Sequence, residues 1–432
     1  MLGTAALRLL LTVSAAYALA IVIVAERFRR LVHRRPERSH EAETAAVSIL
    51  VPLQGVEPGL FENLAAYCRL RHRGPVQIVV GSLDADDPAL PIARDVASQY
   101  ATGDFHVVAG APVLGPNRKV SLLAALARHA RHRVIAAIDS DVRVTPDYLS
   151  RVLPPLFHPG VGLVSCLYRA PRPHTLAQAF EALCVAADFC PSVMLAHVLG
   201  RSDIALGASL VLHRATLDEI GGFATLVEYL ADDHRLAEIV SASGKRVTLA
   251  AHVVESNPDP ATLGAAVRHQ VRWGRTVRAC APWGYAANIV THGVSFAACA
   301  IALAPVLPSS VARLAIVVVL LRLVAAAAGA RALGATLGWT LALVPLRDLT
   351  ATAIWVASFA NGIEWRGRRY RLMAEGRLID AAAAGQRGRA IVRADAHGPL
   401  AGDPSSVSLL EATAPGLGGG PGLDVIGHAD RA

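Results

Sequence analysis

The stretch Arg133-Val134-Ile135-Ala136-Ala137-Ile138 is a short apolar run that leads directly into Asp139-Ser140-Asp141. Its length and composition predict a buried strand, with the carboxylates at its carboxyl end. Two carboxylates one residue apart can share a divalent cation and a ribose or diphosphate, because hard cations such as Mg²⁺ and Mn²⁺ prefer oxygen ligands. The alternative interpretation is an exposed turn, since Asp and Ser also favour turns.

Three similar apolar runs precede this one, separated by helical stretches. The predicted strands cover residues 47–52, 76–83 and 105–108, and the predicted helices cover 60–70, 91–100 and 120–129. Strands that alternate with helices indicate an α/β domain with a parallel sheet covered on both faces. In such sheets, ligands bind beyond the carboxyl ends of the strands. Asp84 follows the second strand and, with Asp139, marks a nucleotide or sugar-phosphate site.

Composition places this α/β domain beside a membrane. Of the 432 residues, 53% are hydrophobic and 18% are charged, which excludes a disordered chain and indicates membrane segments. The net charge is +8, and only Lys119 and Lys245 are lysines. Arginines that flank apolar runs are more typical of the cytoplasmic face of a membrane than of a nucleic-acid site.

The N-terminal residues 1–26 predict an uncleaved membrane anchor. The apolar run Leu9 to Ala25 is followed by an arginine cluster, whereas a cleaved signal peptide carries its positive charges before the apolar run. We therefore expect the N-terminus outside and the domain at 45–280 in the cytoplasm, which suits a bacterial inner membrane.

Residues 281–362 predict further transmembrane or interfacial helices. The candidate spans are 284–307, 311–330 and 337–360, followed by the basic and aromatic segment 365–371. Three full spans would place that basic segment outside, against the positive-inside rule, so one span is interfacial, re-entrant or divided. The tail at 376–432 is rich in Ala, Gly and Arg and predicts a flexible segment.

Further charged motifs follow the strand-end aspartates. Asp232-Asp233 precedes a predicted helix, where one carboxylate could take a proton from an alcohol or simply cap the helix. Lys119 begins a helix, where it could meet a phosphate or remain solvated. The segment from Arg268 to Arg278 includes Arg272-Trp273, which could bind a diphosphate or form an amphipathic helix on anionic lipid.

In this order the motifs resemble the family 2-like membrane glycosyltransferases with a GT-A (Rossmann-like) fold. The resemblance is greatest to the ceramide glucosyltransferase group and, within it, to bacterial hopanoid-biosynthesis glycosyltransferases. It covers about residues 1–375. The passages that carry it are 51–58, 62–64, 84–89, 117–120, 139–144, 161–168, 220–223, 229–233 and 268–278.

The resemblance implies a role for each site residue. Asp84 would contact the uridine of a UDP-sugar, Asp139 the ribose or sugar, and Asp141 a divalent metal (Mg²⁺ or Mn²⁺). Asp233 would be the general base, while Lys119 and Asp232 would lie on the donor side. Arg272 and Trp273 would bind the diphosphate and close over the site. His269 stands where the family motif has Gln or Arg, and its role is left open.

The implied reaction is inverting transfer of glucose or N-acetylglucosamine from a UDP-sugar to a hydroxyl of a membrane lipid, a hopanoid polyol or ceramide. No second carboxylate is placed as a nucleophile, which favours single displacement. Two rival functions are a processive polysaccharide synthase and a non-enzymatic basic membrane-anchored binding protein. The expected partners are a nucleotide sugar and a lipid, with no nucleic acid; the oligomeric state is left open.

Overall fold

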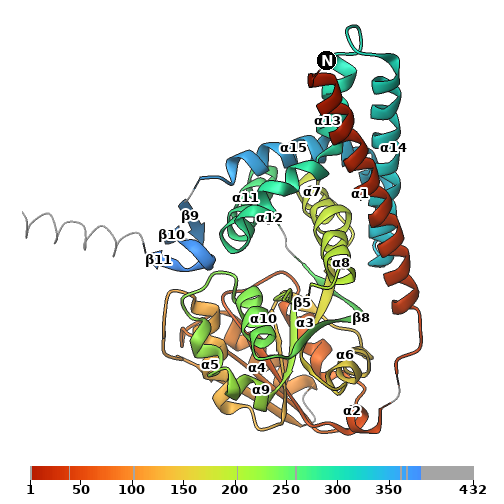
Figure 1. Cartoon of the computed structure of the whole chain (residues 1–432). Helices are drawn as coiled ribbons and strands as arrows, with labels where there is room; N and C mark the ends of the chain where they lie inside the picture. The colour runs from red at the N-terminus through yellow and green to blue at the C-terminus, as the bar shows by residue number, and fades with distance from the viewer. Residues whose placement is uncertain are drawn as a thin grey trace, which may run out of the picture. The chain divides into compact units, whose positions relative to one another are not determined.

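The computed structural model describes residues 2–37, 39–100, 103–201, 203–257, 260–360, 362–365 and 368–380 of the 432-residue chain. Nearly all of the predicted flexible tail, 376–432, lies outside these residues. The described part contains an eight-stranded sheet flanked by helices, a group of long apolar helices and a small three-stranded sheet (Figure 1).

The eight-stranded sheet has the strand order β3-β2-β1-β4-β7-β6-β8-β5. Its strands are β1 (Val47–Pro52), β2 (Val76–Ser82), β3 (Asp104–Ala109), β4 (Val134–Ile138), β5 (Val142–Arg143), β6 (Val161–Arg169), β7 (Ser209–His213) and β8 (Arg246–Ser256). β1 pairs in parallel with β2 and β4, and β2 pairs in parallel with β3. The four predicted strands are therefore confirmed to within a residue or two.

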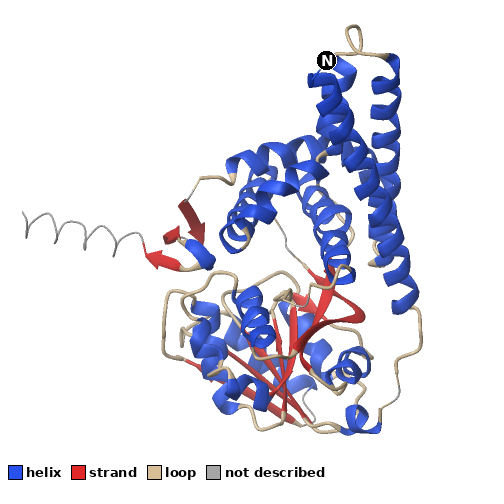
Figure 2. Ribbon diagram, in the orientation of Figure 1, coloured by secondary structure: helices blue, strands red, loops and turns tan. Residues whose placement is uncertain are grey.

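The second half of the sheet corrects the expectation of an all-parallel sheet. β7 runs antiparallel to both of its neighbours, β4 and β6, and β5 runs antiparallel to β8. The chain leaves β6 into a long helical segment and re-enters the sheet in β7 from the end at which β6 left it. The α/β class is confirmed, and the sheet is mixed (Figure 2).

Helices cover both faces of this sheet. They are α2 (His40–Thr44), α3 (Leu60–Cys68), α4 (Ala89–Tyr100), α5 (Arg118–His129), α6 (Tyr148–Leu156), α9 (Arg214–Glu219), η2 (Phe223–Leu226) and α10 (Asp232–Ala242). Every residue of β1 is buried. Ile49 and Val51 pack with α3, α4 and α6, whereas Leu50 packs with α5 and α10 on the opposite face. This burial on two faces explains why β1 is an uninterrupted apolar run.

Among the described residues, four helices are long and apolar enough to cross a membrane, or five if a bent pair forms one span. These windows are Gly3–Val32, Leu176–Val198, Ser309–Ala332 and Gly338–Ala357, with Pro282–Thr291 and Gly293–Ala302 as the pair, bent by 46°. The elements are α1 (Leu2–Val32), α7 (Leu176–Cys184), η1 (Val185–Phe189), α8 (Cys190–Val198), α12 (Pro282–Ala287), η3 (Asn288–Thr291), α13 (Gly293–Ala302), α14 (Ser309–Ala332), η4 (Gly338–Leu343) and α15 (Val344–Ala357).

The apolar segment Leu176–Val198 was not anticipated, because it lies within the predicted catalytic domain at 45–280. Of its most apolar window, 67% is buried, against 28% for each of the other three. It packs against α1, α11 (Leu263–Cys280) and α14. Cys190 Sγ of the same segment donates to Tyr168 O of β6 at 3.4 Å, so the segment contacts both the apolar helices and the sheet.

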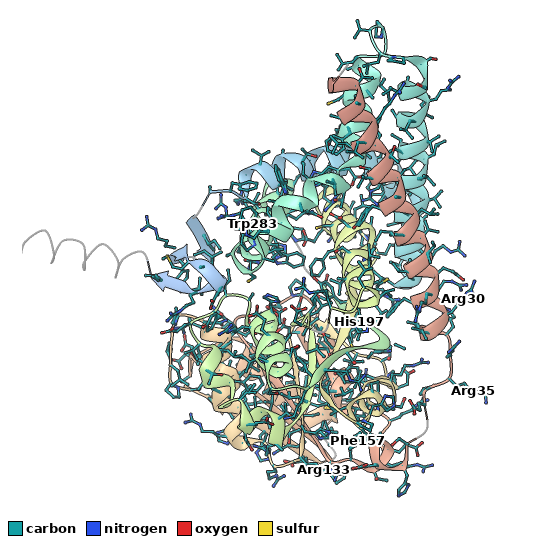
Figure 3. The ribbon with its side chains drawn as sticks, viewed as in Figure 1. Arg30, Arg35, Arg133, Phe157, His197 and Trp283 are labelled. Carbon is teal, nitrogen blue, oxygen red and sulfur yellow. The ribbon has the colours of Figure 1, made fainter. Side chains whose placement is uncertain are left out.

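Polar and aromatic residues mark the ends of the apolar helices. Trp283 on α12 is 87% exposed, and Arg30 and Arg35 lie at and just beyond the end of α1 (Figure 3). Tryptophan and arginine at such positions are typical of a membrane–water border.

A small antiparallel sheet ends the described chain, where the sequence indicated only a basic membrane border. It consists of β9 (Gly362–Trp365), β10 (Arg368–Leu372) and β11 (Leu378–Asp380), with η5 (Ala374–Gly376) before β11. Leu230 N donates to Gly376 O at 2.9 Å, and Leu378 N donates to Glu228 O at 2.7 Å. This sheet is thus bonded to the loop that precedes Asp232 and Asp233.

Candidate active site

Lys119 joins two acidic groups that are far apart in the sequence. Its Nζ lies 2.7 Å from Asp139 Oδ1, at the end of β4, and 3.5 Å from Asp232 Oδ2, at the start of α10. Burial alone would lower the pKa of Lys119, but Asp139 and Asp232 raise it well above its usual value. Lys119 is therefore a fixed positive charge between these carboxylates.

The N-terminus of α5 holds Lys119 in this position. Asn117 caps the helix, because its Oδ1 accepts from Val120 N at 3.1 Å. Its Nδ2 donates to Tyr229 O at 2.7 Å and to Asp232 Oδ1 at 3.4 Å. Asn117 thus orients the lysine and ties α5 to the acidic loop, a role that sequence reasoning did not assign to it.

Asp233 lies beside this group and is held by backbone amides. Gly207 N donates to Asp233 Oδ2, and His234 N donates to Asp233 Oδ1, both at 2.8 Å. A Cβ on Gly207 would lie 3.3 Å from both Asp233 Oδ2 and Lys119 Nζ, so a glycine allows this close approach. Burial and the charge of Asp232 raise the pKa of Asp233, so this carboxylate binds a proton more readily than an ordinary aspartate.

Asp141 occupies the other side of the β4 end. Its Oδ2 accepts from Ser256 Oγ at 2.7 Å, and its carbonyl accepts from Asn257 N at 3.1 Å. Burial and the nearby charge of Asp139 raise the pKa of Asp141 to about 6. Glu57 adds negative charge there and accepts from Ser140 Oγ at 2.6 Å. A cation would stabilise this group of carboxylates.

Asp84 lies just after the end of β2, as expected, but the nearby Asp87 forms the hydrogen bonds that stabilise this loop. Asp84 is exposed, and its Oδ1 accepts from Asp86 N at 3.1 Å. Asp87 is buried and accepts from Gly55 N, Ser82 Oγ and Ala89 N. It thereby ties the loops after β1 and β2 together. Three acidic residues lie between positions 84 and 87, and the sequence did not indicate which of them is exposed and which is buried.

Arg272 and Trp273 lie on α11, which packs against α7 and η5. Trp273 is half-buried, and its ring centroid lies 5.3 Å from that of Phe189 and 4.8 Å from that of His269. His269 Nδ1 lies 2.8 Å from Oε1 of Glu181, a residue that sequence reasoning missed.

The structure therefore groups Lys119, Asp139, Asp141, Asp232 and Asp233 at one edge of the sheet, with Asp84 at the end of β2, which is separated from β4 by β1. The model of glycosyl transferase family 21 matches residues 10–378 of the chain, which includes all of these positions. The chain belongs to glycosyl transferase family 21. The resemblance to the ceramide glucosyltransferase group is thereby confirmed, and the GT-A fold class agrees with the mixed sheet.

Family 21 relatives are distant in sequence. The chain is 22% identical over 228 residues to ceramide glucosyltransferase 1 of Caenorhabditis elegans, covering 52% of this chain and 48% of that protein. It is 28% identical over 125 residues to the ceramide glucosyltransferase of Candida albicans, covering 26% and 23% respectively. The chain thus spans about half the length or less of these curated relatives.

Two solved glycosyltransferases match part of the chain at low sequence identity. A mannosyltransferase from Pyrobaculum calidifontis, solved with GDP-mannose and Mn²⁺, matches 82% of this chain and 97% of its own, with 20% identity and a TM-score of 0.47. Glucosyl-3-phosphoglycerate synthase from Mycobacterium tuberculosis, solved with Mn²⁺, UDP and phosphoglyceric acid, matches 53% and 78%, with 16% identity and a TM-score of 0.35.

Proposed function

We propose that this family 21 protein is a membrane-bound, inverting glycosyltransferase that moves glucose or N-acetylglucosamine from a UDP-sugar to a hydroxyl of a lipid. The observation that carries the proposal is the shared lysine, because Lys119 joins Asp139 at the end of β4 to Asp232 and its neighbour Asp233. Basic and acidic groups are thereby concentrated where α/β sheets bind nucleotides.

Asp233 is the general base in this proposal. Two hydrogen bonds from backbone amides fix the carboxylate. Its raised pKa strengthens its affinity for the proton that the alcohol loses. Asp233 takes the proton as the lipid oxygen attacks the anomeric carbon, and UDP departs from the opposite face. Such a single displacement inverts the configuration of the sugar.

The donor side consists of Asp84, Asp139, Asp232 and Arg272. Asp84 and Asp139 are assigned to the uridine and the ribose or sugar, and Asp232 helps to hold Lys119 in place. The guanidinium of Arg272, with Trp273 beside it on α11, is assigned to the diphosphate. Positive charge there stabilises the leaving group as the bond to the anomeric carbon breaks.

A divalent cation fits Asp141. Its carboxyl is buried among the negative charges of Asp139 and Glu57, a crowding that a cation would relieve. The described part of the chain has no group of three or more His, Cys, Asp or Glu side chains suited to a metal. Mg²⁺ is typically held by one or two carboxylates and substrate phosphates, and it would supply charge neutralisation at the diphosphate.

The position of the apolar helices favours a lipid as the acceptor. The apolar segment Leu176–Val198 packs against both α1 and α11, and α11 carries Arg272 and Trp273. A lipid hydroxyl can therefore reach the site from the bilayer while the UDP-sugar arrives from the aqueous side. Ceramide is suggested by the names of the relatives, and a hopanoid polyol by the motif resemblance.

The test uses the full-length protein in lipid nanodiscs with UDP-glucose or UDP-N-acetylglucosamine and either ceramide or a hopanoid polyol. We expect one sugar per lipid by mass spectrometry, with a β-linkage by NMR. Asp233→Asn should lower turnover by about 10²–10⁴-fold, whereas the exposed Asp95→Asn on α4 should not. Polymeric products would favour a polysaccharide synthase. Absence of any sugar transfer would refute the proposal.

A further inference from the structure

The buried Glu181 and the half-buried His269 form a pair that the proposed chemistry leaves unused. Glu181 on α7 is 1% exposed. Its Oε1 lies 2.8 Å from His269 Nδ1, and its Oε2 accepts from Gln270 Nε2 at 3.3 Å. A carboxylate beside Nδ1 holds a proton on that nitrogen and fixes the orientation of the ring, which leaves Nε2 as its second hydrogen-bonding atom. The side chain of His269 is 27% exposed, so part of this pair is open to a ligand.

A series of aromatic rings leads from this pair to β6 of the sheet. Ring centroids are 4.8 Å apart for His269–Trp273, 5.3 Å for Trp273–Phe189 and 6.1 Å for Phe189–Tyr168. Burial and then nearby acidic groups, including Glu181 and Asp233, raise the pKa of Tyr168. The series therefore extends from His269 on α11 to Tyr168 on β6.

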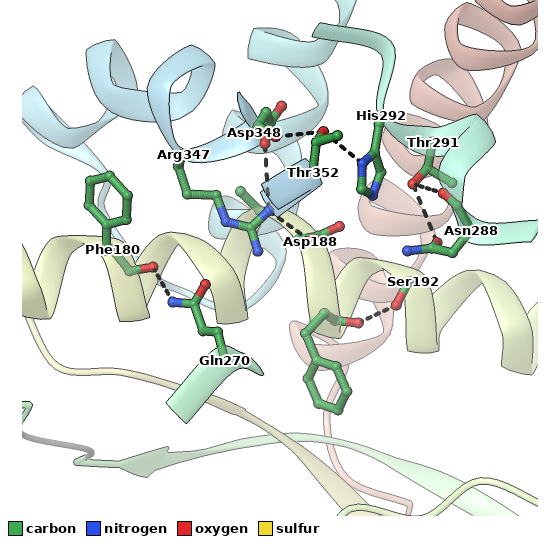
Figure 4. A network of polar contacts seen from close by, with 12 residues as sticks. Phe180, Asp188, Ser192, Gln270, Asn288, Thr291, His292, Arg347, Asp348 and Thr352 are labelled. Carbon is green, nitrogen blue, oxygen red and sulfur yellow. Dashed lines mark hydrogen bonds and ion pairs between the residues drawn. The ribbon is translucent and has the colours of Figure 1, made fainter. Parts of the chain in front are cut away.

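The helical segment that carries Glu181 continues from α7 into η1 and α8, and it makes further polar contacts along its length. After α7, η1 is a π-helix, an irregularity frequent at functional sites. Asp188 within η1 accepts from Arg347 NH1 at 2.7 Å, and Gln270 contacts Phe180 O earlier on the segment (Figure 4). Nε of Arg347 is buried without a hydrogen-bond partner. Polar groups at these positions favour contact with the polar end of a lipid over contact with its hydrocarbon chains.

We propose that Glu181 and His269 form a subsite for the polar end of the lipid acceptor. His269 Nε2 forms a hydrogen bond with a hydroxyl that does not react, and the aromatic series lies alongside the acceptor so that its reacting hydroxyl meets Asp233. His269 is a positioning residue and transfers no proton. The lipid it selects carries at least two hydroxyl groups. This inference rests on the proposed function and adds the acceptor chemistry to it.

The test compares His269→Phe, which keeps a ring but removes the nitrogen, with the wild-type protein in nanodiscs. The acceptors are a short-chain ceramide and its 3-deoxy analogue, or a hopanoid polyol and its mono-ol. One neutral hydrogen bond corresponds to about a tenfold effect. We expect the KM for the two-hydroxyl lipid to rise about tenfold, while the KM for the UDP-sugar and the slow hydrolysis of the UDP-sugar by water stay unchanged.

Two controls separate positioning from folding. His197→Phe changes an exposed histidine on α8 (Figure 3) and should leave both KM values unchanged. Glu181→Gln should give a smaller rise than His269→Phe, because an amide oxygen can still accept from Nδ1. With the deoxy analogue, wild type and His269→Phe should become equal.

The outcomes distinguish this subsite from the function on which it rests. If the wild-type protein transfers sugar to lipid and His269→Phe has an unchanged acceptor KM, the subsite is wrong and the transferase proposal stands. Equal rises in the acceptor and donor KM values also overturn the subsite, because the pair would then only join α7 to α11. If the wild-type protein glycosylates neither lipid, both proposals fail.

Discussion

The ammonium of Lys119 lies 2.7 Å from the carboxylate of Asp139, and this bond joins the helix after β3 to the end of β4. Lys119→Met removes the positive charge and leaves Asp139, Asp232 and Asp233 facing one another. We expect a loss of about 1–3 kcal/mol of stability, less than for a fully buried pair because Asp139 is 33% exposed. Turnover should fall on the order of 10²-fold, because the carboxylate of Asp233 would move from its position for proton transfer.

Lys245→Met is the matched control, since the only other lysine forms an ion pair with the half-exposed Glu219. It should cost less than about 1 kcal/mol and leave turnover unchanged. Thermal unfolding in detergent and initial rates check both variants. Equal effects of the two substitutions would contradict a special role for Lys119.

Asp141 should make stability depend on pH and on divalent cations. Burial and Asp139 raise its pKa to about 6 in the folded protein, above the ordinary value of about 3.9. The unfolded chain therefore loses this proton first, and stability falls as pH rises from about 4 to 6. A cation binds the ionised carboxylate, so Mn²⁺ should raise the Tm more at pH 7 than at pH 5.

Asp141→Asn is the corresponding control and should abolish this difference between the two pH values. Asp95→Asn, an exposed change on α4, should preserve it. A Mn²⁺ effect that is equal at both pH values in the wild-type protein would argue against Asp141 as the metal ligand.

Asp84 and Asp87 should give opposite phenotypes. Asp87→Ala removes the acceptor for Gly55 N, Ser82 Oγ and Ala89 N, and should destabilise the protein by about 2–4 kcal/mol. Asp84→Ala changes an exposed side chain, so it should leave the Tm unchanged and raise the KM for the UDP-sugar. Thermal unfolding and donor titration check this pair. A large loss of stability in Asp84→Ala would show that the two roles are assigned the wrong way round.

The ion pair between Arg322 and Asp348 should stabilise the apolar helices. Arg322 Nε lies 2.7 Å from Asp348 Oδ2, and both side chains are nearly buried. Arg322→Met should cost about 3–5 kcal/mol, because it leaves a buried carboxylate short of a partner, and adding Asp348→Leu should recover part of this loss. Arg313→Met, at an exposed position of the same helix, should have little effect. Strictly additive losses in the double variant would contradict this coupling.

The sequence predicted the first half of the sheet well, since buried parallel strands have no polar face and stand out as apolar runs such as 134–138. It also predicted that distant aspartates gather at one sheet edge, because the carboxyl ends of parallel strands share that edge. It could not predict that Lys119 bridges Asp139 and Asp232, because that contact depends on the loop before α10. Glu181 was missed because an acidic residue inside an apolar run gives no sign of its partner on α11.

The small sheet at 362–380 has a consequence for the order of synthesis. Gly376 O and Leu378 N bond to the loop before Asp232, and Gly376 lies close to Cys280 of α11. A nascent chain has made the catalytic loop long before the ribosome reaches these strands, so the loop gains its last supports only after α14 and α15 have emerged. Under the proposed function, sugar transfer therefore depends on a chain that has been synthesised through residue 378, and a stalled chain would hold the aspartates without the brace that fixes them.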